Sequence, residues 1–280
     1  MNIRKNLSAS LLLVIVLSVI AALAGSAADD QKLKQSVKLI DEFKSPGLEA
    51  EISGVFPHPT DPDLYYALAN LKPPYRHGQT PKLPEEYRGK LLTVNRAGEV
   101  LKAVEMAQDD FGGMAMAKGH LYVALTAGAE ILKVDPDNGA IVDRFPLPSP
   151  AGGLGYDAER NALIAQLYVG HPHLAVVDLD SGQVRQNLWS DESAMGLAKV
   201  DGDYLCTWAS GWDPGSFSEL RVLSQDTGHV LSRIRLDLVH SSLAPATDEE
   251  GEPAFISLVT LDSQNGDTAI RKYAYSGTTR

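Results

Sequence analysis

Two histidines separated by one residue, His171 and His173, form the clearest pair of side chains in this sequence that could do chemistry. Alternate residues of an extended strand point to the same side, so the two imidazoles could bind one metal ion. Such a site needs a third ligand, and the alternative is two solvent-exposed loop residues beside Pro172. No Gly-x-Ser-x-Gly, His-Glu-x-x-His or Walker pattern occurs, while a Ser/His/Asp triad assembled only in space stays open.

The composition is that of a folded, acidic protein. The 280 residues are 44% hydrophobic and 22% charged, which provides enough apolar material for a buried core. The 36 acidic residues outnumber the 25 basic ones, and the net charge of -11 argues against nucleic acids and anionic membranes as partners. The single cysteine, Cys206, excludes an internal disulfide and a zinc site with two thiolates, and its apolar strand predicts a buried, inert thiol.

Residues 1–28 have the pattern of a secretory signal peptide. Two basic residues, Arg4 and Lys5, precede the apolar run Leu11–Leu23, and small residues follow at 24–28. The run is 13 residues long, whereas a membrane-spanning helix needs about 20, although an uncleaved anchor is the alternative. We expect cleavage after Ala27 or Ala28 to leave residues 29–280 as one domain, periplasmic or secreted, with no membrane span.

Two sequence patterns recur along the chain, roughly every 40 to 50 residues. The first is an apolar strand, a polar turn and a glycine, and it ends at Gly98, Gly139, Gly182, Gly228 and, more weakly, Gly277. The second opens a short apolar strand, at Ser53-Gly54, Gly112-Gly113, Gly152-Gly153, Met195-Gly196 and Ser242-Leu243. A polar residue and a glycine between β-rich runs predict a hairpin, because glycine accepts the positive φ of a tight turn.

Repeats of this length with four short strands each predict the blades of a β-propeller. A blade cannot bury its apolar faces alone, so the ring of blades must close. The last repeat has three strands, because only three residues follow Gly277, whereas Val37–Phe43 is strand-like and has no blade of its own. We expect Val37–Phe43 to supply the missing outer strand of an all-β, five-bladed propeller. Six blades are the alternative if residues 31–51 contain further strands.

The propeller architecture predicts which loops lie on the same face of the ring. We expect two kinds of loop to surround the mouth of the central channel. The first kind links the fourth strand of one blade to the first strand of the next, and the second kind joins the second and third strands within a blade. The first blade carries an insertion there, within residues 72–89, and long loops on rigid scaffolds concentrate function. Aromatic and polar side chains at a concave mouth favour a ligand site. The candidate ligand-binding residues are Glu51, Tyr75, Arg76, His77, Asp110, His171, His173, Trp212 and His240.

The repeats resemble those of known bacterial propellers. The layout of Leu121–Val123, Ile131–Asp135 and Gly139, found again between Gly153 and Gly182, is similar to YVTN and NHL repeats. The first repeat, which opens with Glu-Ile-Ser-Gly-Val at residues 51–55, also resembles the SdiA-regulated family. These resemblances imply a propeller architecture but no particular function, because such folds host binding, scaffolding and hydrolysis alike.

A second resemblance implies chemistry. Propellers of the gluconolactonase group hold a divalent metal with a Glu and Asn or Asp residues near the starts of their inner strands. The matching positions here are Glu51, Asp110, Pro150, Ser193 and, with a slip of one residue, His240. The resemblance therefore implies a metal site made of Glu51, Asp110 and His240, with a divalent cation as the candidate cofactor.

Three functions follow from these observations. The first is an exported propeller that binds a protein, peptide or small molecule on the face with the insertion, without chemistry. The second is a metal-dependent lactonase or esterase that uses Glu51, Asp110 and His240. The third is a redox-accessory propeller in which His171 and His173 take part in a metal or quinone site. No catalytic residue can be assigned from the sequence.

Overall fold

The computed structural model describes residues 36–46, 51–70, 89–108, 110–168, 173–190, 195–211, 215–262 and 267–277. All of its strands belong to one compact unit, Gln35–Gly277. In these ranges the chain folds into β-strands and turns, with no α-helix. No helix in the described part of the chain has the length and apolar character needed to cross a bilayer.

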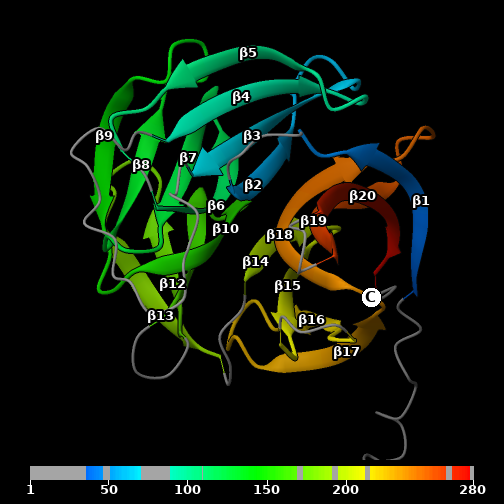
Figure 1. Cartoon of the computed structure of the whole chain (residues 1–280). Helices are drawn as coiled ribbons and strands as arrows, with labels where there is room; N and C mark the ends of the chain where they lie inside the picture. The colour runs from blue at the N-terminus through cyan, green and yellow to red at the C-terminus, as the bar shows by residue number, and fades with distance from the viewer. Residues whose placement is uncertain are drawn as a thin grey trace, which may run out of the picture. The chain divides into compact units, whose positions relative to one another are not determined.

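In the described ranges twenty strands form five four-stranded antiparallel sheets, the blades of a five-bladed β-propeller (Figure 1). Blade 1 contains β2 (Glu51–Pro57), β3 (Leu64–Asn70), β4 (Lys90–Asn95) and β5 (Val100–Glu105). Blade 2 contains β6 (Phe111–Ala117), β7 (His120–Leu125), β8 (Glu130–Val134) and β9 (Ile141–Pro146). Blade 3 contains β10 (Ala151–Asp157), β11 (Ala162–Leu167), β12 (His173–Asp178) and β13 (Val184–Trp189). Blade 4 contains β14 (Gly196–Val200), β15 (Asp203–Ala209), β16 (Ser218–Leu223) and β17 (Val230–Leu236). Blade 5 contains β18 (Val239–Thr247), β19 (Pro253–Asp262), β20 (Asp267–Ser276) and β1 (Ser36–Lys44).

The N-terminal strand closes the ring as the sequence predicts. In Figure 1 the blue strand β1 lies beside the orange and red strands of blade 5. It pairs antiparallel with β20 from Ser36 opposite Ser276 to Lys44 opposite Ala269, and Glu42 accepts a 2.7 Å hydrogen bond from Arg271 across this pair. The prediction of five blades closed by Val37–Phe43 is therefore confirmed, and the six-bladed alternative is wrong.

The turn glycines of the repeat have the predicted left-handed backbone. Gly98, Gly139, Gly182 and Gly228 have φ of 83°, 71°, 69° and 80°. Each also packs against the outer strand of the preceding blade, since a Cβ at Gly139 would lie 2.7 Å from Val104 Cγ1. Glycine at these turns thus serves both the hairpin and the contact with the neighbouring blade.

The glycines of the inner strands have another purpose, which is to let neighbouring inner strands approach closely. A Cβ at Gly113 would lie 2.7 Å from the backbone nitrogen of Leu154, and one at Gly196 would lie 2.6 Å from that of Leu243. In blade 5 Ser242 takes the place of the glycine, and its hydroxyl accepts a 3.3 Å hydrogen bond from the backbone N–H of Val55 in blade 1.

We expect Gly196→Ala to lower the free energy of unfolding by about 2 kcal/mol, because its methyl group meets backbone that cannot rotate away. The matched control is Gly119→Ala. Gly119 has a φ of 77° and open space around its Cβ position, so this change should cost about 1 kcal/mol from backbone strain alone. Urea unfolding of both variants measures the difference. Equal stability of Gly196→Ala and the unaltered protein would show that the inner strands can move apart.

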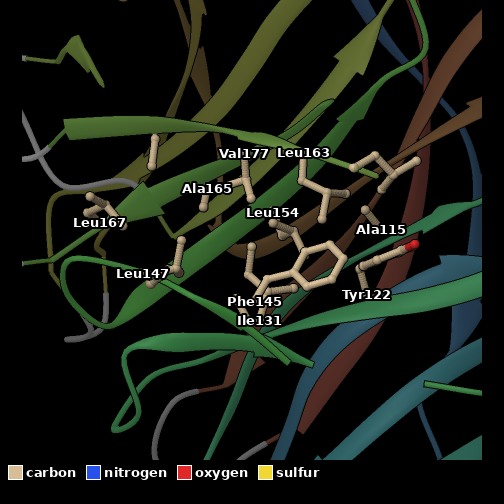
Figure 2. Close-up of a cluster of buried hydrophobic side chains, with 14 of the residues drawn as sticks. Ala115, Tyr122, Ile131, Phe145, Leu147, Leu154, Leu163, Ala165, Leu167 and Val177 are labelled. Atoms are coloured by element: carbon tan, nitrogen blue, oxygen red, sulfur yellow. The ribbon is translucent and has the colours of Figure 1, made fainter. Parts of the chain in front are cut away.

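The hydrophobic core is divided among the five seams between neighbouring blades. Figure 2 shows the seam between blades 2 and 3, where the rings of Tyr122 and Phe145 lie 5.7 Å apart beside Leu163 and Ala165. Strands packed on both faces are buried throughout, as β11 is, whereas the outer strand β5 is largely exposed. Cys206 lies in the seam between blades 3 and 4 and is buried, as predicted.

Candidate functional site

The candidate site lies on the face of the ring where the inner strands β2, β6, β10, β14 and β18 begin, here called the mouth face. Five of the predicted site residues lie outside the described residues: Tyr75, Arg76, His77, His171 and Trp212. His173 begins β12, but its side chain also lies outside the described part of the structure. The prediction that His171 and His173 share a metal or quinone site therefore stays a prediction.

The register of the inner hairpins shows which residues occupy equivalent positions. A register shift follows Ile52 in β2, Phe111 in β6, Ala151 in β10 and His240 in β18. The residues one position earlier share one place at the mouth face: Glu51, Asp110, Pro150 and Val239. His240 thus corresponds to Ile52, Phe111 and Ala151, which are core residues, and Val239 is the true counterpart of Glu51 and Asp110.

His240 is accordingly buried rather than placed at the mouth, which corrects the predicted assignment. Its side chain is 0% exposed, and its Nδ1 lies 2.9 Å from the hydroxyl of Ser257. That hydroxyl donates to the carbonyl oxygen of Ser242 at 2.7 Å, so Nδ1 must be the protonated ring nitrogen. The ring of Tyr273 lies 5.5 Å away. Burial lowers the pKa of His240 to about 4, and the ring is neutral at pH 7.

The three side chains predicted to bind a metal are not brought together. Within the described ranges no group of three His, Cys, Asp or Glu side chains could hold a metal ion. Glu51, Asp110 and His240 all fall in those ranges. The physical reason is the one-residue difference in register, which turns His240 into the core while Glu51 is exposed.

Asp110 has the most unusual backbone on the mouth face. Its φ is 59°, a left-handed conformation that non-glycine residues adopt infrequently. The other described non-glycine residues with positive φ are Lys118, Asn161 and Asp201, and all three lie in turns between first and second strands. Thr126 fixes Asp110, because its N–H and hydroxyl both donate to the Asp110 carbonyl oxygen, at 2.8 and 3.0 Å.

The carboxylate of Asp110 is left without a partner in the described part of the protein. Hydrogen bonds are found for its backbone carbonyl, but neither a hydrogen bond nor an ion pair involves its side chain. The side chain is half-buried. A left-handed backbone thus presents a carboxylate that is not hydrogen-bonded to any residue in the described ranges.

Sequence reasoning missed a set of polar residues that faces these positions. In four blades a hydrogen-bonding side chain lies at or near the end of the second strand. These residues are opposite Glu51, Asp110, Pro150 and Val239 in turn: Asn70, Thr126, Tyr168 and Thr260. The amide of Asn70 bonds both the N–H and the carbonyl of Phe111, at 2.9 and 3.1 Å. The hydroxyl of Tyr168 lies over Gly152, where a Cβ would be 2.1 Å from it. A comparison of the residues at this one repeat position could have found the set.

Comparison with known proteins supports the fold. No protein-family model and no curated protein matches the sequence. Among solved structures, glutaminyl cyclase from Myxococcus xanthus is similar with a TM-score of 0.59 and 11% identity, over 86% of this chain and 98% of that one. The WD40 β-propeller domain of Doa1 gives a TM-score of 0.46 with 12% identity, over 85% and 97% of the two chains. Hydrazine synthase from Kuenenia stuttgartiensis gives 0.48 with 10% identity, over 83% and 66%. The likeness to the cyclase agrees with the β-propeller fold, while membership of the YVTN, NHL or SdiA-regulated families stays a prediction.

Proposed function

We propose that this chain is an exported β-propeller that binds a small molecule, peptide or protein partner on its mouth face. The single observation that carries the proposal is Asp110, a half-buried carboxylate without a partner in the described ranges, held in a left-handed backbone conformation. Strained positions persist where the surrounding structure fixes them, and they concentrate at functional sites. An ionised carboxylate accepts hydrogen bonds only, so the ligand should offer an N–H or O–H group.

The surroundings of Asp110 support a binding role. Asn70 and Thr126 fix the backbone of Phe111 and Asp110 through their side chains, and Tyr168 and Thr260 occupy the equivalent positions of blades 3 and 5. Tyr168 is 43% exposed, while burial raises the pKa of its hydroxyl, so the exposed part of its ring is what a ligand could contact. No observation in the described part of the structure favours the metal-dependent hydrolase or the redox-accessory alternative.

The test compares Asp110→Gly with Asp201→Gly, a matched control on the opposite face. Asp201 also has a left-handed backbone, with φ of 48°, and lies in a turn of blade 4. Glycine removes backbone strain at both positions, so each variant should keep or gain stability, by up to about 1 kcal/mol. A drop in stability for Asp110→Gly alone would show that the carboxylate has a structural role and would remove the support for a site.

Binding is then measured as a rise in melting temperature with amino acids, short peptides and sugars as probes. A ligand at 100 times its Kd stabilises a protein by about 2.7 kcal/mol. We expect a probe that stabilises the unaltered protein and Asp201→Gly but not Asp110→Gly. Equal stabilisation of both variants would exclude Asp110 from the site. Export is tested separately, by N-terminal sequencing of the expressed protein, which should begin at Ala28 or Asp29.

A further inference from the structure

A pocket of about 500 Å³ lies where the first and last blades meet, at the end of the ring opposite the mouth face. Its walls come from β1, from the turn between β2 and β3, and from β18, β19 and β20. Phe43, Tyr65 and Ile256 form the buried part, and the prolines of residues 57–62 and Pro245 form the rim. We call this the seam pocket. Its volume lies in the range of small-molecule sites, about 300–1,000 Å³.

The seam pocket is open because the residues that fill another seam at this level are missing here. Between blades 3 and 4, Asp157 accepts hydrogen bonds from Lys199 at 2.7 Å and Tyr204 at 2.6 Å. Arg160 covers this cluster and reaches Asp226 at 2.9 Å. These long charged side chains occupy the space between the two inner strands.

The same positions between blades 5 and 1 carry short, uncharged side chains. Tyr65 corresponds to Tyr204, and Pro57, its register partner, corresponds to Lys199. The end of β18 that faces them is Pro245-Ala246-Thr247, which carries no charge. The tyrosine is kept, with its hydroxyl bonded to the carbonyl of Lys44 at 2.7 Å, but the ion cluster around it is absent. Because short, uncharged side chains replace the charged cluster at these positions, the space between the blades stays open as the seam pocket.

Two cations line the seam pocket, and they differ in how they are compensated. Arg96 bonds Asp41, lies 3.7 Å from Asp63 and stacks over Phe43 at 4.6 Å. The side chain of Lys272 is half-buried and makes no hydrogen bond or ion pair with any described residue. Its register partner on β1 is Asp41, whose carboxylate bonds Arg96 instead. The one acid in the lining, Asp61, accepts the backbone N–H of Asp63 at 3.0 Å. An ammonium that is not bonded to either of these acids, beside an apolar floor, favours an anion with an apolar body.

We propose that the seam pocket binds a small organic carboxylic acid, with the carboxylate on Lys272 and an aromatic or aliphatic body against Phe43 and Ile256. The Pro-rich rim favours an apolar ligand body, because pyrrolidine rings present apolar faces without hydrogen-bond donors. This site does not depend on Asp110 or on the mouth face, since it is built from different strands at the other end of the ring.

The test uses phenylacetate as the probe, with phenylacetamide as its uncharged counterpart and hexanoate as an aliphatic acid. Binding is measured by calorimetric titration of the unaltered protein, Lys272→Met, Lys272→Arg and Lys133→Met. Lys133 is the matched control, because it is also half-buried on a strand and without an ion pair in the described ranges. The melting temperature of each variant shows whether it is folded.

We expect Lys272→Met to weaken phenylacetate binding at least about tenfold, the effect of one hydrogen bond to a charged group. Lys272→Arg and Lys133→Met should bind as the unaltered protein does, and phenylacetamide should bind at least about tenfold more weakly than the acid. The proposal is overturned if Lys272→Met keeps full affinity, if the amide binds as well as the acid, or if neither phenylacetate nor hexanoate binds. Asp110→Gly should leave this binding unchanged, which separates it from the mouth face.

Discussion

Acidification from pH 7 to pH 4.5 should remove about 2 to 3 kcal/mol of unfolding free energy through His240 alone. Burial lowers the pKa of this histidine from 6.5 to about 4. The unfolded chain therefore takes up the proton as the pH falls through 6.5, whereas the folded chain takes it up only near pH 4. Between these values the unfolded state binds more protons, and stability falls as the pH falls. Above pH 6.5 His240 makes no pH-dependent contribution.

Burial is the main reason why His240 does not accept a second proton in the folded state above pH 4. Nδ1 already carries a hydrogen toward Ser257, and the hydroxyl of Tyr273 lies 3.5 Å from Nε2. Asp237 favours the charged ring, but Arg271 opposes it and burial outweighs both. Arg271 itself forms ion pairs with Glu42 of the closing strand and with Asp237.

The measurement is urea unfolding at a series of pH values for the unaltered protein, His240→Asn and His229→Asn. Asparagine places an amide near the position of Nδ1 and does not titrate in this range. At pH 7 the free energy of unfolding of His240→Asn should be lower than that of the unaltered protein by about 1 to 2 kcal/mol, because ring packing is lost. Between pH 6.5 and 4.5 the unfolding free energy of this variant should decline much less than that of the unaltered protein. His229 is exposed, and His229→Asn should keep the full decline. The same decline in His240→Asn would show that other groups cause it.

His240 also shows why part of the site could not be read from the sequence. The repeat correctly places its segment at the start of an inner strand, but side chains of a strand alternate between its two sides. The register shift between His240 and Ser242 decides which side the histidine takes, and a bulge of this kind has no reliable local signature. A slip of one residue turned a predicted metal ligand into a core residue.

Features encoded locally were predicted well. The turn glycines require positive φ within a few residues, and the unpaired Val37–Phe43 follows from counting strands, so blades and closure could both be derived. The contacts that made Gly113 and Gly196 necessary lie in neighbouring blades, and the sequence marked those glycines without explaining them. Likewise, Lys272 and Tyr65 line one pocket only because the first and last blades adjoin, which no local pattern reveals.

Phe43→Ala should lower the free energy of unfolding by about 3 to 5 kcal/mol, the range for truncating a buried phenylalanine. Phe43 is 9% exposed and packs with Ile52, Ile256 and Ile270, so its ring joins the closing strand to both the first and the last blade. The control on the same strand is Leu39→Ala. Leu39 is 44% exposed, and its truncation should change stability by less than about 1 kcal/mol.

Removal of the whole closing strand should have the largest effect. A chain that begins at Ser45 lacks every pair between β1 and β20, exposes the edge of β20 and loses the packing of Phe43. The sum exceeds the 3 to 5 kcal/mol of Phe43 alone and approaches the total stability of a domain, about 5–15 kcal/mol. Because an exposed strand edge pairs with other chains, we expect this chain to aggregate or unfold, whereas a chain that begins at Ser36 should fold.

Circular dichroism and size-exclusion chromatography compare the two chains. A folded monomer from the shorter chain, with an unchanged melting temperature, would mean that the ring holds together without β1 and that hydrophobic packing between inner strands is sufficient for closure.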